Sequence, residues 1–316
     1  MNDPNFRWNF SVNVLDISFY NLAVNMVSQA TILPLLVSQL TNSKLAIGLL
    51  PVISSLGFLL PQLLTAGYSE GLRRKKPFLM FYSALGERLP LLLTGLFVGF
   101  FSNSAPAIAL GATYLGLAIS SSTSGILTPA WFDMIAKVIP LQWRGIWFGL
   151  GNGLGAFMGI AGAAIAGRLL SAWAFPQNYA MCFLLAFLFN CISWTGLALN
   201  REPDSLAVKT HASFAGYLKQ LPSVVRRDRN YQIFLISRSI ANLGGMAAGF
   251  FIVYGAERFG LSGAQVGALT AVFVGSQALM NLLWGFMGDR KGHKLVLVCS
   301  SAAMALATLA ALLLAS

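Results

Sequence analysis

A succession of long apolar runs, separated by short polar connectors, most constrains what this chain can fold into. Each run has roughly 20 residues or more, the length needed to cross about 30 Å of hydrocarbon. In lipid, backbone N–H and C=O groups must be bonded within the segment, so each run predicts a helix. The sequence therefore predicts an all-α membrane protein with about nine transmembrane helices. The runs lie at approximately 12–40, 45–66, 78–101, 106–132, 145–170, 179–199, 231–255, 263–287 and 295–315.

Composition excludes several classes of protein. Hydrophobic residues make up 56% of the chain and charged residues only 10%, whereas about a quarter of the residues of a soluble domain are charged. The net charge of +11 comes from basic residues in short turns rather than from a basic patch with interleaved aromatics, so we expect no nucleic-acid partner. The three cysteines lie in apolar runs without a Cys-x-x-Cys pair. We therefore expect no metal site and no cofactor.

The distribution of lysine and arginine predicts the orientation of the chain. The N-terminal segment and the connectors after the second, fourth, sixth and eighth runs hold nearly all of the basic residues outside the runs. The opposite connectors hold little beyond Lys44 and Arg258. Lysine and arginine are enriched in cytoplasmic loops. We therefore expect a multi-pass protein of the cytoplasmic membrane with its N-terminus inside.

A basic turn between the eighth and ninth runs carries a recognisable pattern. Residues 285–294 read Gly-Phe-Met-Gly-Asp-Arg-Lys-Gly-His-Lys, and glycines together with several charges predict a tight turn outside the hydrocarbon. The pattern Gly-x-x-x-Asp-Arg-x-Gly-x-Lys resembles the signature loop of the major facilitator superfamily, which lies between the second and third helices of each six-helix half. Residues 66–75 form a degenerate copy in which Glu70 aligns with Asp289. Such a recurrence is typical of parallel repeats.

The resemblance implies a facilitator-type helical bundle of twelve helices in two halves. The longest polar stretch separates six predicted helices from three, which divides the chain into an N-terminal six-helix bundle (1–199), a cytoplasmic linker (200–230) and an incomplete C-terminal bundle (231–316). About three of the expected twelve helices would be missing. We interpret the chain at this point as a fragment, a truncated chain or a split reading frame.

The resemblance also implies a function. A facilitator is a secondary transporter, a permease or efflux carrier, that moves a small organic solute by alternating access between its two bundles. We expect the solute and a possible coupling proton or sodium ion as partners, and a monomer in the lipid bilayer. We expect no enzyme, because both histidines lie in polar loops and no Ser/His/Asp or His-x-x-x-His arrangement appears. The alternative is a non-transporting, inactive membrane protein.

Polar residues at helical spacing indicate a substrate cavity. Asn21, Asn25 and Gln29 follow one face of the first run, and amides aligned through a span need partners or water. The resemblance implies that the first and seventh helices line the central cavity. Hydrogen bonding between helices is the alternative for every one of these residues. The predicted substrate-cavity residues are Asn21, Asn25, Gln29, Arg238, Asn242, Gln277 and Asn281.

Charges near the basic connectors suggest a cytoplasmic gate. The acid, proline and Arg-Gly pattern of residues 133–145 is similar to one found between the fourth and fifth helices of many facilitators. Ion pairs between this segment and the turn at residue 289 would break when the two halves move relative to each other. The alternative is that these are solvated charges that only set the topology, since exposed pairs are worth about 0 to 1 kcal/mol. The predicted gate residues are Glu70, Asp133, Arg144, Asp289 and Arg290.

Charges inside the runs need a separate explanation. Glu87 and Arg88 lie near the middle of the third run, where a charge costs about 2.5 to 3.5 kcal/mol on insertion scales. Because neighbours on an α-helix point about 100° apart, we expect each to find a polar group on an adjacent helix rather than to pair with the other. Glu87 is a possible coupling residue that carries a proton. We expect Asp16 to be an interfacial or structural charge.

Two ladders of small residues predict close helix packing. In lipid, small residues every four positions let another backbone approach. Facilitators bring their fifth and eighth helices together between the halves, so the resemblance implies that the two ladders meet there. Packing within one half is the alternative. The predicted packing residues are Gly151, Gly155, Gly159 and Gly167 in the fifth run, and Gly267 and Gly275 in the eighth.

Overall fold

The computed structural model describes residues 4–205, 227–244 and 247–315, and over these residues it is helical without any strand. The all-α prediction is confirmed, and within the described residues each predicted run overlaps one helix or consecutive helices. The elements are α1 (Phe6–Met26), α2 (Ile32–Leu40), α3 (Lys44–Glu70), α4 (Lys76–Ser83), the π-helical turn η1 (Ala84–Arg88), α5 (Leu89–Phe101), α6 (Pro106–Val138), α7 (Leu141–Ala172), α8 (Gln177–Ala198), α10 (Arg229–Gly244), α11 (Ala247–Phe259), α12 (Gly263–Lys291) and α13 (His293–Ala315).

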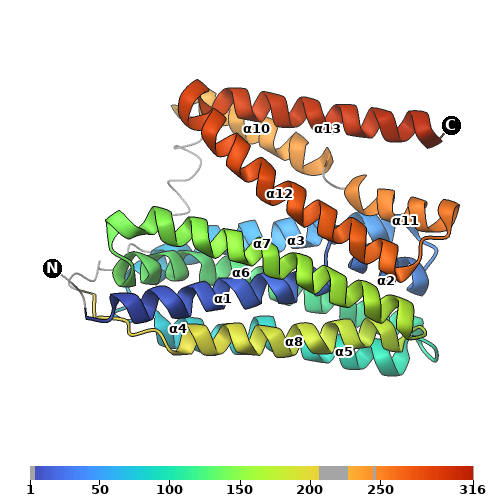
Figure 1. The fold of residues 1–316 in the computed structure, drawn as a ribbon, viewed down its shortest axis with the longest axis horizontal. Helices are drawn as coiled ribbons and strands as arrows, with labels where there is room; N and C mark the ends of the chain where they lie inside the picture. Colours follow the sequence, from blue (N-terminus) through green and yellow to red (C-terminus); the bar gives the residue numbers. More distant parts are fainter. Residues whose placement is uncertain (1–3, 206–226, 245–246, 316) are drawn as a thin grey trace.

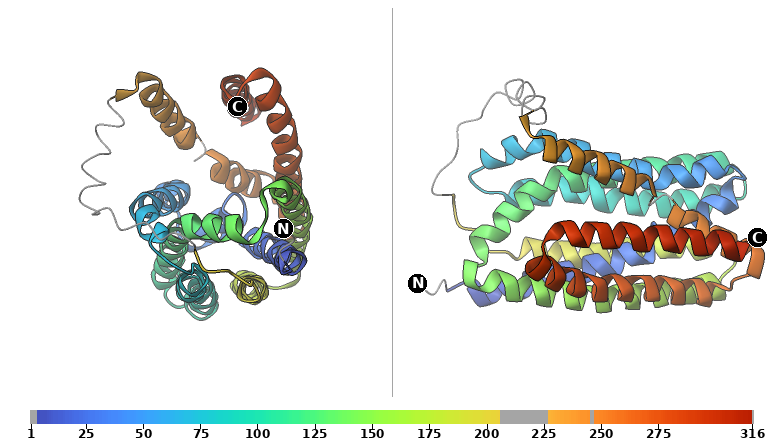
Figure 2. Two further views of the ribbon diagram at one scale, coloured as in Figure 1. Left: turned by 90° about the vertical axis from the view of Figure 1, so that its left-hand side faces the viewer. Right: turned by 90° about the horizontal axis from the view of Figure 1, so that it is seen from above.

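The helices form one bundle with a partial second layer beside it. Helices α1, α6, α7 and α8 run side by side along the long axis of the molecule (Figure 1). Helix α12 packs against α7, and α13 packs on α12 away from the bundle. Seen along the helices, α10 lies on the other side from α12 (Figure 2). The α10–α13 segment contacts α1–α8 mainly through α12 and α11, and the largest hydrophobic core includes Ile252, Val253 and Val266 from these two helices.

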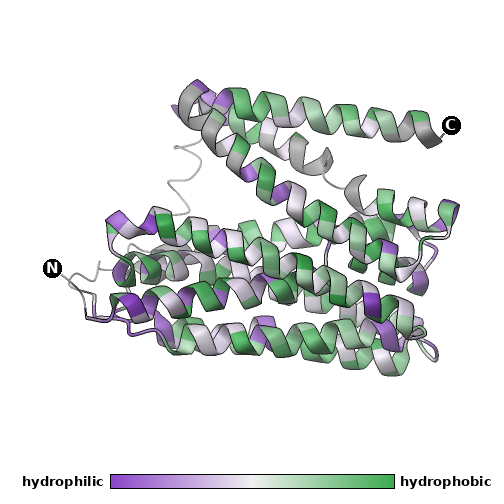
Figure 3. Ribbon diagram, in the orientation of Figure 1, coloured by the Kyte–Doolittle hydropathy of each residue, from purple (hydrophilic) through white to green (hydrophobic). Residues whose placement is uncertain are grey.

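Within the described ranges, five helical segments are long and apolar enough to cross a membrane by length and composition: 44–62, 76–101, 141–172, 177–198 and 263–281. Hydrophobic residues predominate along the helices and hydrophilic ones gather toward their ends (Figure 3). Apolar side chains such as Phe100, Leu115 and Phe157 are exposed on the outside of the bundle. This is the surface expected of helices that face lipid, where outward apolar side chains carry no penalty.

Prolines explain two interruptions within predicted runs. Pro34 has no N–H to donate to the carbonyl four residues earlier, and the helix breaks before it, at residues 27–31 between α1 and α2. Pro90 also lacks an N–H, and it lies just after η1. In η1 the N–H of Leu89 donates to the carbonyl of Ala84, five residues earlier. A π-helical turn of this kind inserts an extra residue into an α-helix.

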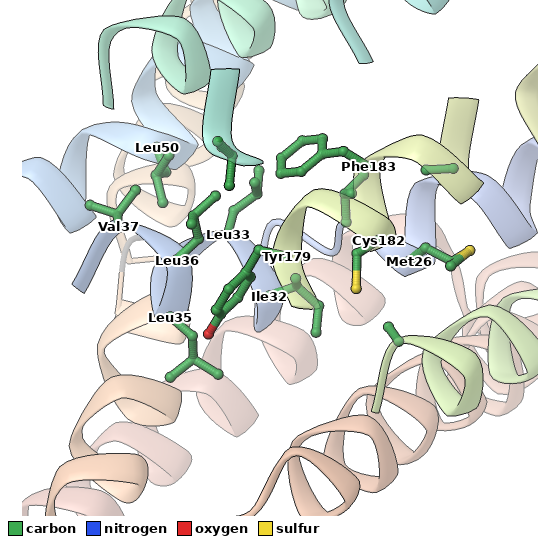
Figure 4. Packing of buried hydrophobic residues seen from close by; sticks show 14 of the residues in the cluster. Met26, Ile32, Leu33, Leu35, Leu36, Val37, Leu50, Tyr179, Cys182 and Phe183 are labelled. Atoms are coloured by element: carbon green, nitrogen blue, oxygen red, sulfur yellow. The ribbon is translucent and has the colours of Figure 1, made fainter. Parts of the chain in front are cut away.

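The largest hydrophobic core lies where α2, α3 and α8 meet, toward the end of the bundle opposite the N-terminus of α1. Leu36 and Val37 of α2 are fully buried near Leu50 of α3, and Cys182 and Phe183 of α8 pack on the same cluster (Figure 4). Interhelical association in lipid depends on such close packing, because apolar surface alone does not favour one partner over the lipid.

A buried carboxylate closes the other end of the bundle. Glu202, just after α8, accepts hydrogen bonds from the backbone N–H groups of Lys75 and Lys76 at 2.8 Å each, and pairs with Lys137 Nζ at 2.7 Å. Its side chain is only 1% exposed. A carboxylate is favoured at a helix N-terminus, here that of α4. Glu202 therefore fastens the end of α8 to α4 and α6.

A second, exposed ion-pair cluster lies beside it. Asp204 pairs with Arg73 at 2.8 Å and with Arg74. The hydrogen bond from the Arg74 guanidinium lowers the pKa of Asp204 below its ordinary value of 3.8. The connector after α8 thus lies against the connector between α3 and α4, and Arg73, Arg74 and Lys137 of α6 come together at this end.

Candidate functional site

Two cavities lie inside the α1–α8 bundle, between α1, α3 and α6. Their volumes are about 250 Å³ and about 380 Å³. The first extends from its centre toward α2, and the second extends toward α4 and the C-terminal part of α6. Glu87 therefore belongs to the walls of both cavities. The two cavities share Tyr20, Phe58, Glu87 and Ser124.

Glu87 and Arg88 form an ion pair at this junction. Arg88 Nη1 lies 2.5 Å from Glu87 Oε2, and the two side chains are only 6% and 13% exposed, for Arg88 and Glu87 respectively. The prediction that the neighbours would not pair with each other was wrong. They belong to η1, and a π-helical turn holds more residues than an α-helical turn, so successive side chains diverge by a smaller angle.

The pair is also held by groups from neighbouring helices, as predicted. Ser124 Oγ of α6 donates to Glu87 Oε1 at 2.7 Å. Arg88 donates through Nε to the backbone carbonyl of Asn190 and through Nη1 to that of Ser83, both at 3.3 Å. A buried ion pair is tolerated only when its remaining donors and acceptors are satisfied. This requirement explains the polar groups that surround η1.

Asp16 of α1 belongs to the same cluster. Ser193 Oγ of α8 donates to Asp16 Oδ1 at 2.6 Å, and Arg88 Nη2 donates to Ser193 Oγ at 3.5 Å. Asp16 is buried and lines the second cavity, and its role as an interfacial or structural charge stays a prediction. Among the described residues that line the two cavities, the charged groups are two carboxylates, Asp16 and Glu87, and one guanidinium, Arg88. If all are ionised, the cluster carries one excess negative charge.

The face of α1 that lines the cavities is not the predicted asparagine stripe. Asp16, Tyr20, Val24 and Val27 face the cavities at helical spacing. The asparagine stripe was predicted because it is the most polar face of the helix. The face that lines the cavities instead combines one acid with aromatic and apolar side chains. No run of amides marked this second face in the sequence. The identity of the neighbouring helices decides which face becomes a wall.

Asn21 and Asn25 instead pack against α7. Their amide nitrogens donate to the carbonyls of Ile17 and Asn21 on their own helix, at 2.9 Å each. A Cβ added to Gly155 or Gly159 would lie 2.8 Å from the amide nitrogen of Asn21 or Asn25, respectively. Solute contact by the two asparagines stays a prediction.

The other predicted cavity residues have three different outcomes. Gln29 lines the first cavity. Gln277 and Asn281 are exposed on α12. The remaining residues lie on described helices, but their side chains are outside the part of the chain that the structure describes. These are Arg238 and Asn242 of the predicted cavity, and Glu70, Asp289 and Arg290 of the predicted gate.

The two gate residues with described side chains, Asp133 and Arg144, lie near the C-terminal end of α6 and the start of α7. Arg144 donates to the carbonyl of Ala136 at 2.6 Å and to that of Ile139 at 3.1 Å, so it caps the C-terminal end of α6, where a cation is favoured. Asp133 is half-buried and forms no ion pair with any described residue. A role in gating stays a prediction for both.

The glycines of α7 contact two different helices. Gly151, Gly155 and Gly159 face α1, where their added Cβ atoms would meet Ile17, Asn21 and Asn25. Further along α7, a Cβ on Gly167 would lie 2.7 Å from the Cα of Gly267 in α12. In the α12 ladder, Gly275 is looser, with Ile160 Cδ1 at 3.8 Å from its added Cβ. The two ladders therefore meet at one end only.

Comparison with known proteins supports the resemblance seen in the sequence. Residues 234–316 match the family model described as the Major Facilitator Superfamily. The matched segment runs from α10 to α13 and contains the basic turn at residues 285–294. The comparison with curated proteins gave no match. The match indicates a transporter rather than an enzyme.

Proposed function

We propose, from the premise that this chain is a major facilitator, that it is a secondary transporter of a small organic solute. The fold and the matched segment support that premise. The observation that carries the proposal is the pair of cavities that meet at Glu87 inside a bundle of apolar helices. In this scheme, the solute contacts a wall made of aromatic, hydroxyl and charged side chains. Binding sites of this composition, mostly apolar with a few placed polar groups, suit small organic molecules.

The proposed movement is rocking of α10–α13 against α1–α8. Two observations support this division of the chain. One hydrophobic core, around Met134 and Trp147, lies wholly within α1–α8, although the larger core also takes in Ile252, Val253 and Val266 of α11 and α12. The backbones of α7 and α12 approach closely at the glycine pair Gly167 and Gly267. We place the bundles at residues 1–199 and 231–316, joined by a linker at 200–230. The start of that linker is fastened to the first bundle by Glu202.

The proposed location is the cytoplasmic membrane, with the basic end of the bundle inside. Arg73, Arg74 and Lys137 lie together at that end through their contacts with Asp204 and Glu202, and Lys44 begins α3 at the opposite end. This clustering agrees with the enrichment of basic residues on the cytoplasmic side.

Glu87 is the proposed coupling residue for a proton or a sodium ion. It lines both cavities, and a carboxylate within a span commonly marks a path for ions or protons. Coupling would require exchange of the partners of Glu87 between the two conformations of the carrier.

Flux measurements on reconstituted protein test the proposal. Purified chain in liposomes should show saturable uptake of at least one labelled small organic solute from a broad panel, beyond the leak of protein-free liposomes. Folded protein that shows no saturable flux of any member of the panel would argue against transport by this chain.

A further inference from the structure

We propose that the two cavities around Glu87 bind a protonated organic amine with an aromatic or alkyl body. This inference rests on the proposed function, because it names the chemical class of the solute. It arises from three independent properties of the cavity walls: their charge, an unpaired acceptor and their aromatic lining.

The charge of the walls favours a cation. Asp16, Glu87 and Arg88 all line the second cavity. Arg88 already donates to Glu87, to two backbone carbonyls and to Ser193. It is therefore occupied by its own neighbours, and the remaining negative charge is not matched by another cation among the described residues of the walls. A bound cation would neutralise it, whereas an anion would be repelled.

An unpaired acceptor calls for a ligand with a hydrogen-bond donor. Asn190 is 2% exposed, and its Oδ1 has no hydrogen-bond partner among the described residues. Buried polar atoms are nearly always paired. Asn190 lines the first cavity together with Glu87. The N–H groups of one ammonium could therefore be shared between a carboxylate and this amide oxygen, which a quaternary ammonium cannot do.

The remaining walls suit the organic body of an amine. The second cavity is lined by five aromatic side chains, and the face of an aromatic ring attracts a cation. A bare metal ion would instead need several oxygen ligands around it. A proton on one carboxyl would remove the excess charge but would leave both the Asn190 acceptor and the aromatic walls unused. The aromatic residues are Tyr20, Phe58, Trp131, Phe132 and Phe148.

Three ligands that share one ring and differ in charge test this proposal. Calorimetric titration of purified protein with benzylammonium should give saturable binding at least about tenfold tighter than benzyl alcohol, a difference of about 1.4 kcal/mol. Benzoate should not bind. Equal affinity for benzylammonium and benzyl alcohol, or no saturable binding of benzylammonium by folded protein, would overturn the proposal.

Matched variants place the binding in the cavity. Glu87→Gln leaves Arg88 balanced by Asp16, and Asp16→Asn leaves it balanced by Glu87, so each variant removes the excess charge without isolating the guanidinium. Each should weaken benzylammonium binding about tenfold or more. The control Glu257→Gln makes the same change on an exposed side chain of α11 and should not alter binding. If one cavity variant fails to fold, the other provides the test. Unchanged affinity in a folded cavity variant would contradict the proposal.

The two proposals fail in different ways. Saturable benzylammonium binding without flux of any solute would leave the inference intact and count against transport. Saturable flux of other solutes, with no benzylammonium binding and no competition from it, would leave transport intact and remove the amine site.

Discussion

Gly167 of α7 and Gly267 of α12 meet backbone to backbone, since a Cβ added to Gly267 would lie 2.6 Å from the Cα of Gly167. Real Cβ atoms essentially never come this close to another heavy atom. In lipid, small residues that let two backbones approach are the main source of specificity between helices. This contact joins the α1–α8 bundle to the segment that matches the facilitator family.

Gly167→Ala should therefore destabilise the protein. The added methyl group would press on the backbone of α12, and overpacking of this kind costs about 1 to 3 kcal/mol. The measurement is the thermal unfolding midpoint in detergent. Gly153→Ala is the matched control on the same helix, because nothing lies within 4 Å of its added Cβ. Equal midpoints for the two variants would refute the close-contact argument.

Glu202→Gln should lower stability far more than Asp204→Asn. Glu202 is almost fully buried and bonds to two backbone N–H groups and to Lys137. Loss of a helix cap costs about 0.5 to 2 kcal/mol, and loss of a charged partner adds to it. Asp204 pairs at the surface, where water and salt screen ion pairs, so its contribution to stability should be small. Thermal unfolding of both variants checks the ranking, which fails if the two effects are the same size.

The contribution of Asp204 should depend on pH with a defined sign. The folded state lowers the pKa of Asp204, chiefly through the hydrogen bond from Arg74. The folded state thus favours the ionised form, and this contribution is present above the ordinary value of 3.8 and is lost as the pH falls through the lower folded value. The unfolding midpoints of wild type and Asp204→Asn, compared from about pH 7 to about pH 3, should converge only at the acid end. Convergence near neutral pH would contradict this assignment.

Substitution of Arg88 should destabilise the protein more than substitution of its partner Glu87. Arg88→Gln leaves Asp16 and Glu87 buried without a cation, and breaking a buried pair costs about 3 to 5 kcal/mol. Glu87→Gln should cost clearly less, because Asp16 still balances Arg88 through Ser193. The double variant Arg88→Gln with Glu87→Gln should therefore be more stable than Arg88→Gln alone. Thermal unfolding of the three variants is the measurement, and an equal loss in both single variants would show that Asp16 is not a counterion.

Cysteine labelling tests the proposed orientation. In a variant without Cys182, Cys191 and Cys299, Ser262→Cys should react with a membrane-impermeant maleimide in intact cells. Ser205→Cys should react only after the membrane is permeabilised. Ser262 lies in the short connector between α11 and α12, and Ser205 lies in the long connector after α8, at the opposite end of the helices. The reverse labelling pattern would invert the topology.

The positions of the helices could be predicted from sequence because hydropathy averages over about twenty residues and needs no knowledge of neighbours. The breaks within the runs were missed, although Pro34 and Pro90 signal both of them. The role of Glu202 could not be predicted, since its partners Lys75 and Lys137 are distant in the chain and only the fold brings them together.

The candidate site was partly visible in the sequence. Glu87 and Arg88 stood out because charges within an apolar run are costly. Their mutual pairing was missed because it depends on the π-helical geometry of η1. The cavity wall around Tyr20 was missed because an aromatic side chain in a membrane helix gives no sign of which neighbour it faces.

The extra residue in η1 has a consequence for comparing this chain with related sequences. A π-helical turn arises by inserting one residue into an α-helix, so a relative that lacks it would carry a one-residue gap within the segment aligned with Ala84–Arg88. Such a deletion would restore a regular α-helix. The side chains before the deleted position would then be rotated about the helix axis relative to those after it. A single codon gained or lost would thus create or abolish the acidic centre of the bundle.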